Sequence, residues 1–286
     1  GIASRGLGDV YKRQIYTNKM AEKLQLELGD IECEVGMRYG NPSIKSALEK
    51  LKSKGVEELL LAPLFPHHAQ ATTESSTKEA LLNLSKMNWH PKISELGHFE
   101  DDPAFIDPLV NSIKPHIKDN IHILFSFHGL PVSHVKRSDK TGTHCQIVDG
   151  CCSIKKDANS MCYGHHCNMT VKAVVKKLGI SEKDWSISYQ SRLGPAKWLK
   201  PSTISVVEEL AKTDSDVVIV SPAFLADGLE TLEELEIEVK EHFIEHGGKN
   251  LTVVSCLNDN PDWIKGLSTL VNRAFSKSLD IPILNS

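Results

Sequence analysis

The segment 121–131 constrains the fold more than any other part of the sequence. Its first seven residues include five apolar side chains, and Gly129 and Pro131 then interrupt the pattern. Such a run is typical of a strand buried on both faces of a parallel sheet. His128 therefore stands where a buried strand opens into a loop, the edge at which open α/β sheets bind ligands. A neutral imidazole there can accept a proton or bind a metal, although a packed turn histidine fits the same pattern.

Strand and helix patterns alternate along the rest of the chain. Apolar runs predict strands over 31–37, 57–64, 93–97, 121–128, 185–190, 216–220 and 251–254. Helical spacing predicts helices over 16–28, 43–54, 103–116, 168–178, 203–212, 229–246 and 261–276, one more that ends near Met87, and a helix start at Pro42. This alternation calls for parallel sheets with helices on both faces. The prediction is an α/β fold of two Rossmann-like, doubly wound parallel-sheet domains that divide near residue 115.

The domain limits follow from this division. Residues 1–14 show no clear periodicity and look like a translated adaptor read, so we treat them as a non-native segment and exclude them from fold reasoning. Residues 15–115 form the first predicted domain and residues 116–286 the second. The second contains a long irregular loop, 129–167, rich in Cys and His, and loops of this length are usually functional or disordered.

Composition narrows the class of protein. The 286 residues are 40% hydrophobic and 24% charged, as in a globular protein, with a net charge of −4. A general nucleic-acid binder would usually be basic, so we expect no nucleic-acid partner. No secretory signal is visible, and no apolar run is long enough to span a membrane. We therefore expect a cytoplasmic location; the oligomeric state cannot be read from the sequence.

An acidic helix follows the predicted strand at 216–220. Glu230, Glu234 and Glu238 recur every fourth residue on one face of this helix, opposite an apolar face. For Glu234 and Glu238 we expect a solvated acidic face. Glu230 differs because it follows a strand terminus, as His128 does. Two strands of one sheet would bring this base and this carboxylate to the same edge, where they suit proton abstraction or the handling of a divalent cation.

Taken together, five segments resemble the ferrochelatases, enzymes that insert ferrous iron into a porphyrin. They occur in the family's order and are, in this sequence, 35–43, 63–67, 124–131, 188–195 followed by Trp198 and Leu199, and 222–232. The resemblance implies two Rossmann-like domains with a porphyrin cleft between them. It implies a lyase that inserts Fe²⁺ into protoporphyrin IX to give protohaem, the last step of haem biosynthesis.

The resemblance also implies roles for individual residues. His128 matches the family's active-site histidine and Glu230 its partner glutamate; both would act in catalysis and handle the substrate iron. Arg38, Tyr39, Phe65, His67 and Trp198 match residues that line the cleft and bind the porphyrin. An apolar cleft lined by aromatic residues suits a flat hydrophobic ring. Without the resemblance, Trp198 would be interpreted as a core residue and Arg38 as part of a surface ion pair.

Two departures from the family's pattern bear on these roles. Gly228 stands where many relatives carry His or Cys, with little effect expected on the carboxylate. The strand and glycine-containing loop with which the family begins have no counterpart before Ile15, so the first domain is expected to be incomplete and porphyrin binding weakened. Three alternatives stay open: a coproporphyrin III ferrochelatase, a cobalt chelatase, or an inactive porphyrin- or haem-binding relative.

Five cysteines fall within residues 145–167. In a chain without a secretion signal, such a cluster suggests a metal site before disulfides. Four thiolates can hold zinc or a [2Fe–2S] cluster, and the spacing is not that of a zinc ribbon. Some ferrochelatases carry an internal cysteine cluster proposed to bind [2Fe–2S], which this stretch resembles. We expect four cysteine ligands with either Cys151 or Cys152 spare, and we choose Cys145, Cys152, Cys162 and Cys167. His144, His165 or His166 could substitute, and ordinary reduced thiols are the alternative.

The substrates implied by the resemblance are a porphyrin and ferrous iron. Because the product is lipophilic, peripheral membrane contact is compatible with this function, although no amphipathic anchor stands out.

Overall fold

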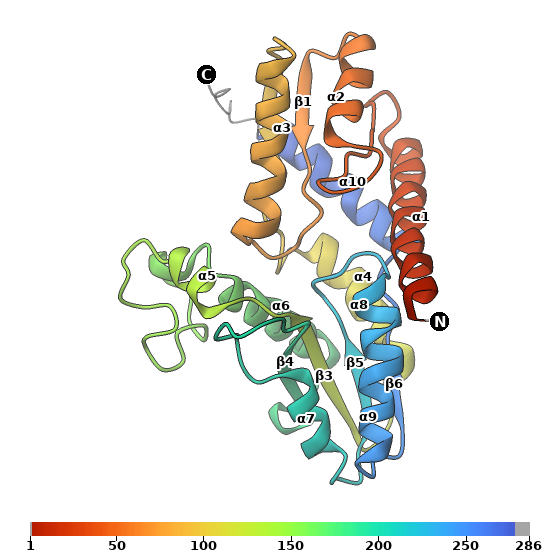
Figure 1. Cartoon of the computed structure of the whole chain (residues 1–286), viewed down its shortest axis with the longest axis vertical. Coiled ribbons are helices and arrows are strands. Elements are labelled where there is room, and N and C mark those ends of the chain that lie inside the picture. The colour runs from red at the N-terminus through yellow and green to blue at the C-terminus, as the bar shows by residue number, and fades with distance from the viewer. Residues whose placement is uncertain (1, 278–286) are drawn as a thin grey trace.

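The computed structural model describes the backbone of residues 2–277 and the side chains of residues 11–277. It consists of two α/β units, one above the other in Figure 1. The upper unit contains strands β1 (Glu58–Leu61) and β2 (Lys92–Glu95), which pair in parallel. The lower unit contains four parallel strands in the order β4-β3-β5-β6. The predicted α/β class with parallel sheets is therefore confirmed.

The lower sheet is built from β3 (Ile121–His128), β4 (Trp185–Gln190), β5 (Asp216–Val220) and β6 (Leu251–Val253). Alternate residues of β3 enter two different cores. Ile123, Phe125 and Phe127 pack into a cluster with α4 (Pro103–Ile113), α6 (Tyr163–Leu178) and α10 (Pro261–Ser276). Leu124 packs on the opposite side with α7 (Thr203–Leu210) and α9 (Lys240–Glu245). Helices thus cover both faces of this sheet, which explains why five of the eight residues of β3 are apolar.

The upper unit has a smaller core. Leu48 and Leu51 of α2 (Ile44–Ser53) and Leu81 and Leu84 of α3 (Ser75–Lys86) pack on β1 and β2. A π-helical turn, Gln70–Glu74, precedes α3. Ser43 caps α2 by accepting the Ser46 N–H, so the helix starts after Ser43 and not at Pro42, which follows Asn41 through a cis peptide bond.

The predicted strand 31–37 is wrong. Apart from a single bridge between Met37 and Ser43, this segment has no strand partner. Its backbone donors have other acceptors: Cys33 N–H donates to Gln25 Oε1, and Met37 N–H donates to Pro42 O at 2.7 Å. An extended segment becomes a strand only where a neighbouring strand supplies hydrogen-bond partners for its backbone. Here a side chain and a turn carbonyl accept the backbone N–H bonds.

Three helix predictions need correction at their limits. α1 runs from Ile2 to Leu28. The described part of segment 1–14, which we excluded from the fold prediction, is therefore helical. α6 begins at Tyr163, five residues before the predicted start. The predicted irregular loop 129–167 also contains a short helix, α5 (Val132–Arg137), and a 3₁₀ turn, Asp157–Asn159. The helix 229–246 is interrupted: α8 (Leu229–Leu232) is followed by a π-helical segment, Glu234–Val239, and then by α9.

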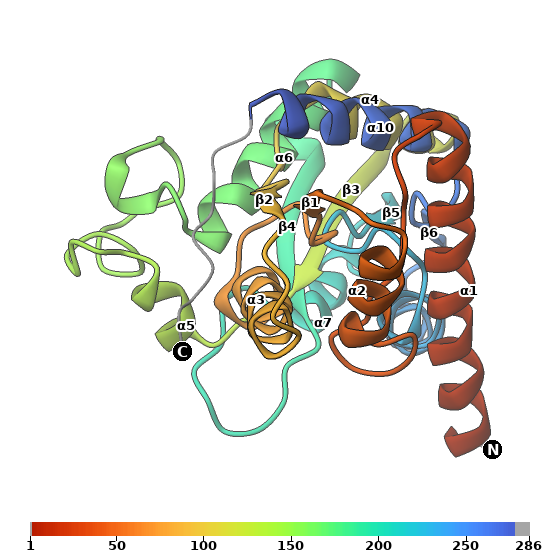
Figure 2. The same cartoon turned by 90° about the horizontal axis from the view of Figure 1, so that it is seen from above.

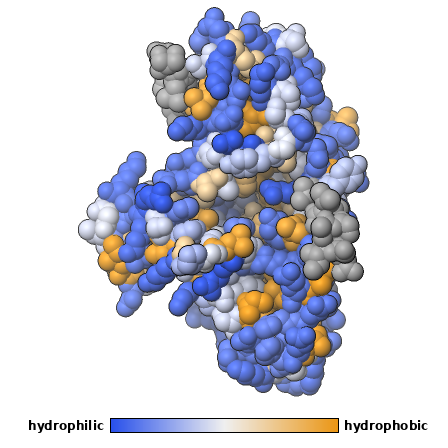
Figure 3. Space-filling model, in the orientation of Figure 1, coloured by the Kyte–Doolittle hydropathy of each residue, from blue (hydrophilic) through white to orange (hydrophobic). Residues whose placement is uncertain are grey.

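The last helix joins the two units. Figure 2 shows α10 lying beside α4, and α10 also contacts α1, β1 and β2. The described helices include none whose length and apolar character would let it cross a membrane. The surface seen in Figure 3 is hollowed between the units, and both hydrophobic and hydrophilic residues lie around the recess.

Gly266 sets the closest approach between α10 and α4. A Cβ at this position would lie 2.0 Å from the Ala104 carbonyl oxygen. We expect Gly266→Ala to lower the free energy of unfolding by about 1–3 kcal/mol, because the backbone of α4 must shift to admit the methyl group. The better helix propensity of alanine offsets at most about 1 kcal/mol of this loss. Lys265→Ala, at an exposed neighbouring position, is the control in urea unfolding followed by circular dichroism. Equal stability of the two variants would contradict the tight crossing.

Candidate active site at the carboxyl edge of the sheet

His128 is the last residue of β3, and the carboxyl end of β3 lies toward the upper unit (Figure 1). It pairs with Gln190, the last residue of β4, and the next N–H, that of Gly129, donates to Gln190 O at 2.7 Å. A Cβ on Gly129 would meet that same oxygen at 2.6 Å, so this strand end requires glycine. His128 Nδ1 lies 2.7 Å from Gly129 O, which can only accept. In neutral His128 the proton is therefore on Nδ1, and Nε2 carries a free lone pair.

Glu230 lies at the same edge, in the first turn of α8. Its backbone carbonyl accepts a hydrogen bond from Gln190 Nε2 at 2.8 Å, and its carboxylate lies 4.0 Å from Arg13 Nη1. Gln190 is buried, and its Oε1 accepts from Ser126 Oγ at 2.7 Å. Gln190 thus ties β3, β4 and the start of α8 together, which brings the histidine and the glutamate to one edge. Our sequence reasoning missed this role; the position of Gln190 at a strand end was the available signal.

Glu234 corrects the predicted solvated acidic face. Its carboxylate accepts from the Ser191 N–H at 2.6 Å, from the Ser191 hydroxyl, and from Gln190 Nε2 at 3.3 Å. The π-helical segment that begins at Glu234 changes the helical phase, and such bulges are frequent at functional sites. Glu238 is exposed, in agreement with the prediction. Glu234 therefore holds the turn after β4 against the helix that carries Glu230.

Two predicted substrate-binding residues lie on the loop before α2. Tyr39 is 77% exposed, and the Arg38 guanidinium lies over its ring, 4.7 Å from the centroid. Arg38 also donates to Ser75 Oγ at 3.1 Å and pairs with Glu79 at 3.6 Å. The ion pair that we considered as the alternative for Arg38 is therefore present, and it orients the guanidinium beside an accessible aromatic face.

The other three predicted cleft residues differ in exposure. Phe65 and Trp198 are partly buried, and Trp198 lies at a bridge to Pro131, just after the His128 strand. Trp198 Nε1 is buried without a hydrogen-bond partner among the described residues. His67, by contrast, is only 2% exposed, and it packs edge-on against Phe127 and Tyr163. Its position is therefore beneath the surface and not on an open cleft wall.

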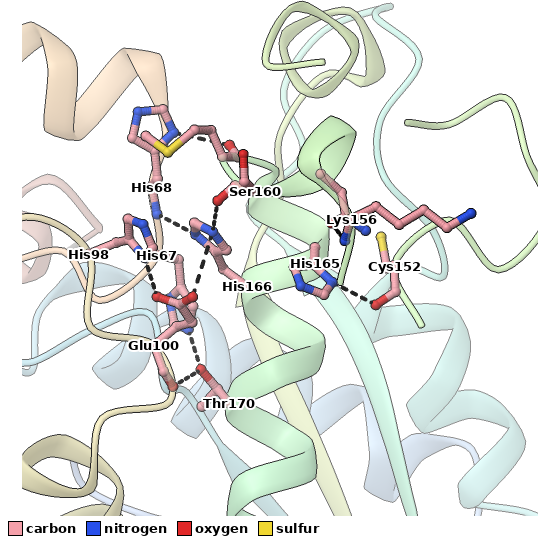
Figure 4. A network of polar contacts seen from close by, with 12 residues as sticks. His67, His68, His98, Glu100, Cys152, Lys156, Ser160, His165, His166 and Thr170 are labelled. Atoms are coloured by element: carbon pink, nitrogen blue, oxygen red, sulfur yellow. Dashed lines mark hydrogen bonds and ion pairs between the residues drawn. The ribbon is translucent and has the colours of Figure 1, made fainter. Parts of the chain in front are cut away.

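His67 belongs to a buried polar network (Figure 4). Its Nε2 bonds Thr170 Oγ1 at 2.8 Å, and this hydroxyl donates to Glu100 O, so Nε2 must carry the proton. Burial lowers the pKa of His67 to about 3, which keeps the ring neutral. The Glu100 carboxylate contacts His98 Nδ1 at 2.6 Å and His166 Nε2 at 3.6 Å. These two histidines lower the pKa of Glu100 to about 2 against the opposing effect of burial.

Four cysteines converge on the loop beyond β3. Cys151 and Cys152 Sγ lie 3.7 Å apart, Cys152 and Cys162 Sγ both lie beside Gly164, and the Cys162 thiol interacts electrostatically with those of Cys152 and Cys145. The Cys152 thiol and the N–H groups of His165 and Gly164 lower the pKa of Cys162 to about 6, since they stabilise its thiolate at the start of α6. Cys167 is fully buried in α6 and shares a core cluster with Cys145, Cys152 and Cys162. Cys151 contacts the group through Cys152, so both Cys151 and Cys167 lie near the other three thiols.

The histidines near this loop have other partners. His144 Nε2 bonds Cys151 O at 3.1 Å, and His165 Nδ1 bonds Cys152 O at 2.9 Å. These rings hold the backbone of the two cysteines. Each ring keeps a second nitrogen that can act as a ligand beside the thiols.

Two solved structures have a similar fold. SirB from Bacillus subtilis with Fe³⁺ superimposes with a TM-score of 0.65, at 17% identity over 96% of this chain and 95% of that one. CbiX, described as the terminal enzyme of sirohaem biosynthesis in denitrifying bacteria, gives a TM-score of 0.54, at 10% identity over 92% of both chains. At these identities the likeness shows the fold alone.

Sequence comparison resolves the family. The ferrochelatase of Bdellovibrio bacteriovorus is 41% identical over 261 residues, which are 90% of this chain and 77% of that protein. The ferrochelatase of Pseudomonas fluorescens is 39% identical over 263 residues, 91% of this chain and 77% of that protein. The family model described as Ferrochelatase matches residues 14–275. The chain that carries His128 and Glu230 at one sheet edge therefore belongs to the ferrochelatase family.

Proposed function

We propose that this ferrochelatase inserts Fe²⁺ into protoporphyrin IX and so forms protohaem, the last step of haem biosynthesis. The observation that carries the proposal is the free Nε2 lone pair of His128 at the carboxyl edge of β3, with Glu230 held at the same edge by Gln190. The segment Phe127–Pro131 has the form that we associate with bacterial members that use protoporphyrin. Coproporphyrin III is the alternative substrate.

The proposed chemistry follows from what metallation requires. Two pyrrole N–H protons must leave the macrocycle, and a desolvated cation must reach four nitrogens. His128 Nε2 can accept the protons, since the bond from Nδ1 to Gly129 O fixes its tautomer. The Glu230 carboxylate can hold the substrate iron or pass protons outward. In this proposal Gln190 and Glu234 position Glu230 and the turn after β4, while Arg38, Tyr39, Phe65 and Trp198 line the porphyrin site.

The choice of porphyrin is tested by parallel assays. Anaerobic insertion of Fe²⁺ or Zn²⁺ is followed by absorbance with protoporphyrin IX and with coproporphyrin III. A higher kcat/KM with protoporphyrin IX is expected, and a preference for coproporphyrin III would overturn the substrate assignment. Porphyrin binding without turnover would favour a haem- or porphyrin-binding protein.

We place the enzyme in the cytoplasm, with peripheral membrane contact for its lipophilic product.

We also propose that Cys145, Cys151, Cys152 and Cys162 hold a [2Fe–2S] cluster. Four converging thiols are the donor set that such a cluster takes, and the contacts through Cys162 and Cys152 support Cys151 over Cys167 as the fourth ligand. The cluster would serve as a structural or redox-sensing centre, because metallation needs no group beyond the edge that carries His128 and Glu230.

The cluster proposal predicts a spectroscopic loss in Cys162→Ser. Because Cys162 interacts with two of the other thiols, anaerobically purified Cys162→Ser should lose the visible Fe–S absorption and the bound iron. Cys33→Ser, outside the loop, is the control and should keep both. Cys167→Ser should also keep both. If Cys167→Ser lost the absorption and the iron while Cys151→Ser kept them, the ligands would be Cys145, Cys152, Cys162 and Cys167, as the sequence predicts. A parent protein with neither absorption nor iron would falsify the cluster itself.

A further inference from the structure

Two histidines and a glutamate meet on the surface near the carboxyl end of α9, at the far end of the interrupted helix whose first turn carries Glu230. His242 lies in α9, His246 caps its carboxyl end, and Glu208 lies in α7. We propose that these three residues bind a divalent transition-metal ion of the Zn²⁺ type. Neither the proposed iron insertion nor the cysteine cluster uses them.

The distances suit one ion. His242 Nε2 lies 2.8 Å and His246 Nε2 lies 4.0 Å from the same Glu208 oxygen. The two imidazole centroids are 4.1 Å apart, and one ligand atom from each residue lies within 4.8 Å of the others. An ion with bonds of about 2.0–2.2 Å to N and O ligands fits between them after small side-chain rotations. Histidines at positions i and i+4 of a helix project from one face, the spacing used in helical zinc sites.

The orientation of His246 supports a ligand more strongly than the distances do. Its Nδ1 lies 2.8 Å from His242 O, which can only accept, so the ring proton is on Nδ1. In neutral His246 the Nε2 lone pair then lies 4.0 Å from a Glu208 carboxylate oxygen, and a cation bound by both would remove the repulsion between them. Metal-ligating histidines almost always donate their other N–H to a carbonyl or carboxylate in this way. His242 can bind through Nε2 once its ring proton moves to Nδ1, with no net change in charge.

The position of the site separates it from the proposed chemistry. The helical segment starts with Glu230 beyond the carboxyl end of β5 and ends with His246 before β6, so this site lies at the opposite edge of the sheet (Figure 1). The side chains are 26–41% exposed, which leaves a path for the ion. A bound ion would join α7 to α9, whose Val207 and Phe243 already share a core. The ion should therefore stabilise the fold without entering the reaction.

A second group with suitable ligands, His98, Glu100 and His166, fits an ion less well. His166 Nδ1 accepts the His68 N–H at 3.1 Å, and its Nε2 bonds Ser160 O at 2.9 Å (Figure 4). A metal on Nε2 would move the ring proton to Nδ1, where it would face a backbone N–H. Both nitrogens of His166 are thus committed to the protein, and this group is a structural network.

The test measures bound Zn²⁺ per chain and the Zn²⁺-induced rise in Tm in the parent, Glu208→Gln, His242→Ala and His246→Ala. Each variant should lose one equivalent of Zn²⁺ or bind it at least about tenfold more weakly, and should lose the rise in Tm. Co²⁺ in place of Zn²⁺ should show ligand-field bands that are absent from His246→Ala, without thiolate charge-transfer bands. That signature separates this site from the cysteine loop.

Two control variants make the result decisive. His90→Ala removes an exposed histidine outside the group, and His98→Ala removes the accessible member of the rival group. Both should bind Zn²⁺ as the parent does, and His246→Ala should retain porphyrin metallation. The same Zn²⁺ stoichiometry and stabilisation in His246→Ala as in the parent would overturn the proposal. Loss of the ion in His98→Ala alone would move the site to the rival group.

Discussion

Replacing His128 with alanine is expected to lower kcat for iron insertion by at least about 100-fold, the lower range for loss of a positioned general base. The reason is the free Nε2 lone pair, which the bond between Nδ1 and Gly129 O leaves available at the sheet edge. The strand end itself does not depend on the imidazole, since Gly129 and Gln190 pair through their backbones and the ring otherwise meets Phe224 edge-on, with centroids 6.1 Å apart. Porphyrin affinity, measured by fluorescence quenching, should therefore change much less than kcat.

His122 provides a matched control on the same strand. It lies near the opposite end of β3, and its Nε2 bonds Ser186 Oγ at 2.9 Å. His122→Ala should metallate porphyrin at the parent rate in the anaerobic absorbance assay. If His128→Ala retained parental turnover, His128 would have no part in proton removal. If both variants lost activity together with their circular dichroism spectrum, the cause would be folding, and His128→Gln would then be needed to separate chemistry from stability.

The parts of the fold that the sequence predicted well are those where burial dictates composition. β3, β4, β5 and α10 have the predicted limits within one residue, because strands between two helical layers must be apolar and an amphipathic helix needs one apolar stripe. The same logic predicts His128 at the sheet edge, since it ends a buried strand, and Glu230 beyond the carboxyl end of β5, in the first turn of α8.

The remainder depended on partners distant in the sequence. Segment 31–37 has strand composition, yet the Gln25 side chain and the Pro42 carbonyl take its donors. Glu234 belongs to a regular acidic pattern, yet a π-helical turn directs it at Ser191. The contact between the Cys151 and Cys152 thiols and the place of Cys167 inside α6 depend on how the loop folds against that helix. Periodicity carries no information on any of these contacts.

Trp263→Ala should be the most destabilising single change in the core that joins the two units. Trp263 is fully buried in α10, stacks on Phe99 with centroids 6.1 Å apart, and meets Phe105 edge-on at 6.0 Å. These partners come from the loop after β2 and from α4, so the indole fills the junction that holds α10 against both units. A loss of about 3–5 kcal/mol in the free energy of unfolding is expected, from lost burial and the cavity left behind.

Trp263→Phe separates packing from polarity at this junction. Trp263 Nε1 is buried without a hydrogen-bond partner among the described residues, so the indole N–H contributes no stabilising bond. Phenylalanine keeps most of the aromatic contact with Phe99 and Phe105 and removes an unsatisfied donor, whose burial costs about 1–3 kcal/mol. Urea unfolding followed by circular dichroism should therefore place Trp263→Phe much closer to the parent than Trp263→Ala. A loss of less than about 1 kcal/mol in the free energy of unfolding of Trp263→Ala would contradict the role of α10 in holding the units together. A cavity of that size in a rigid junction should cost more than this.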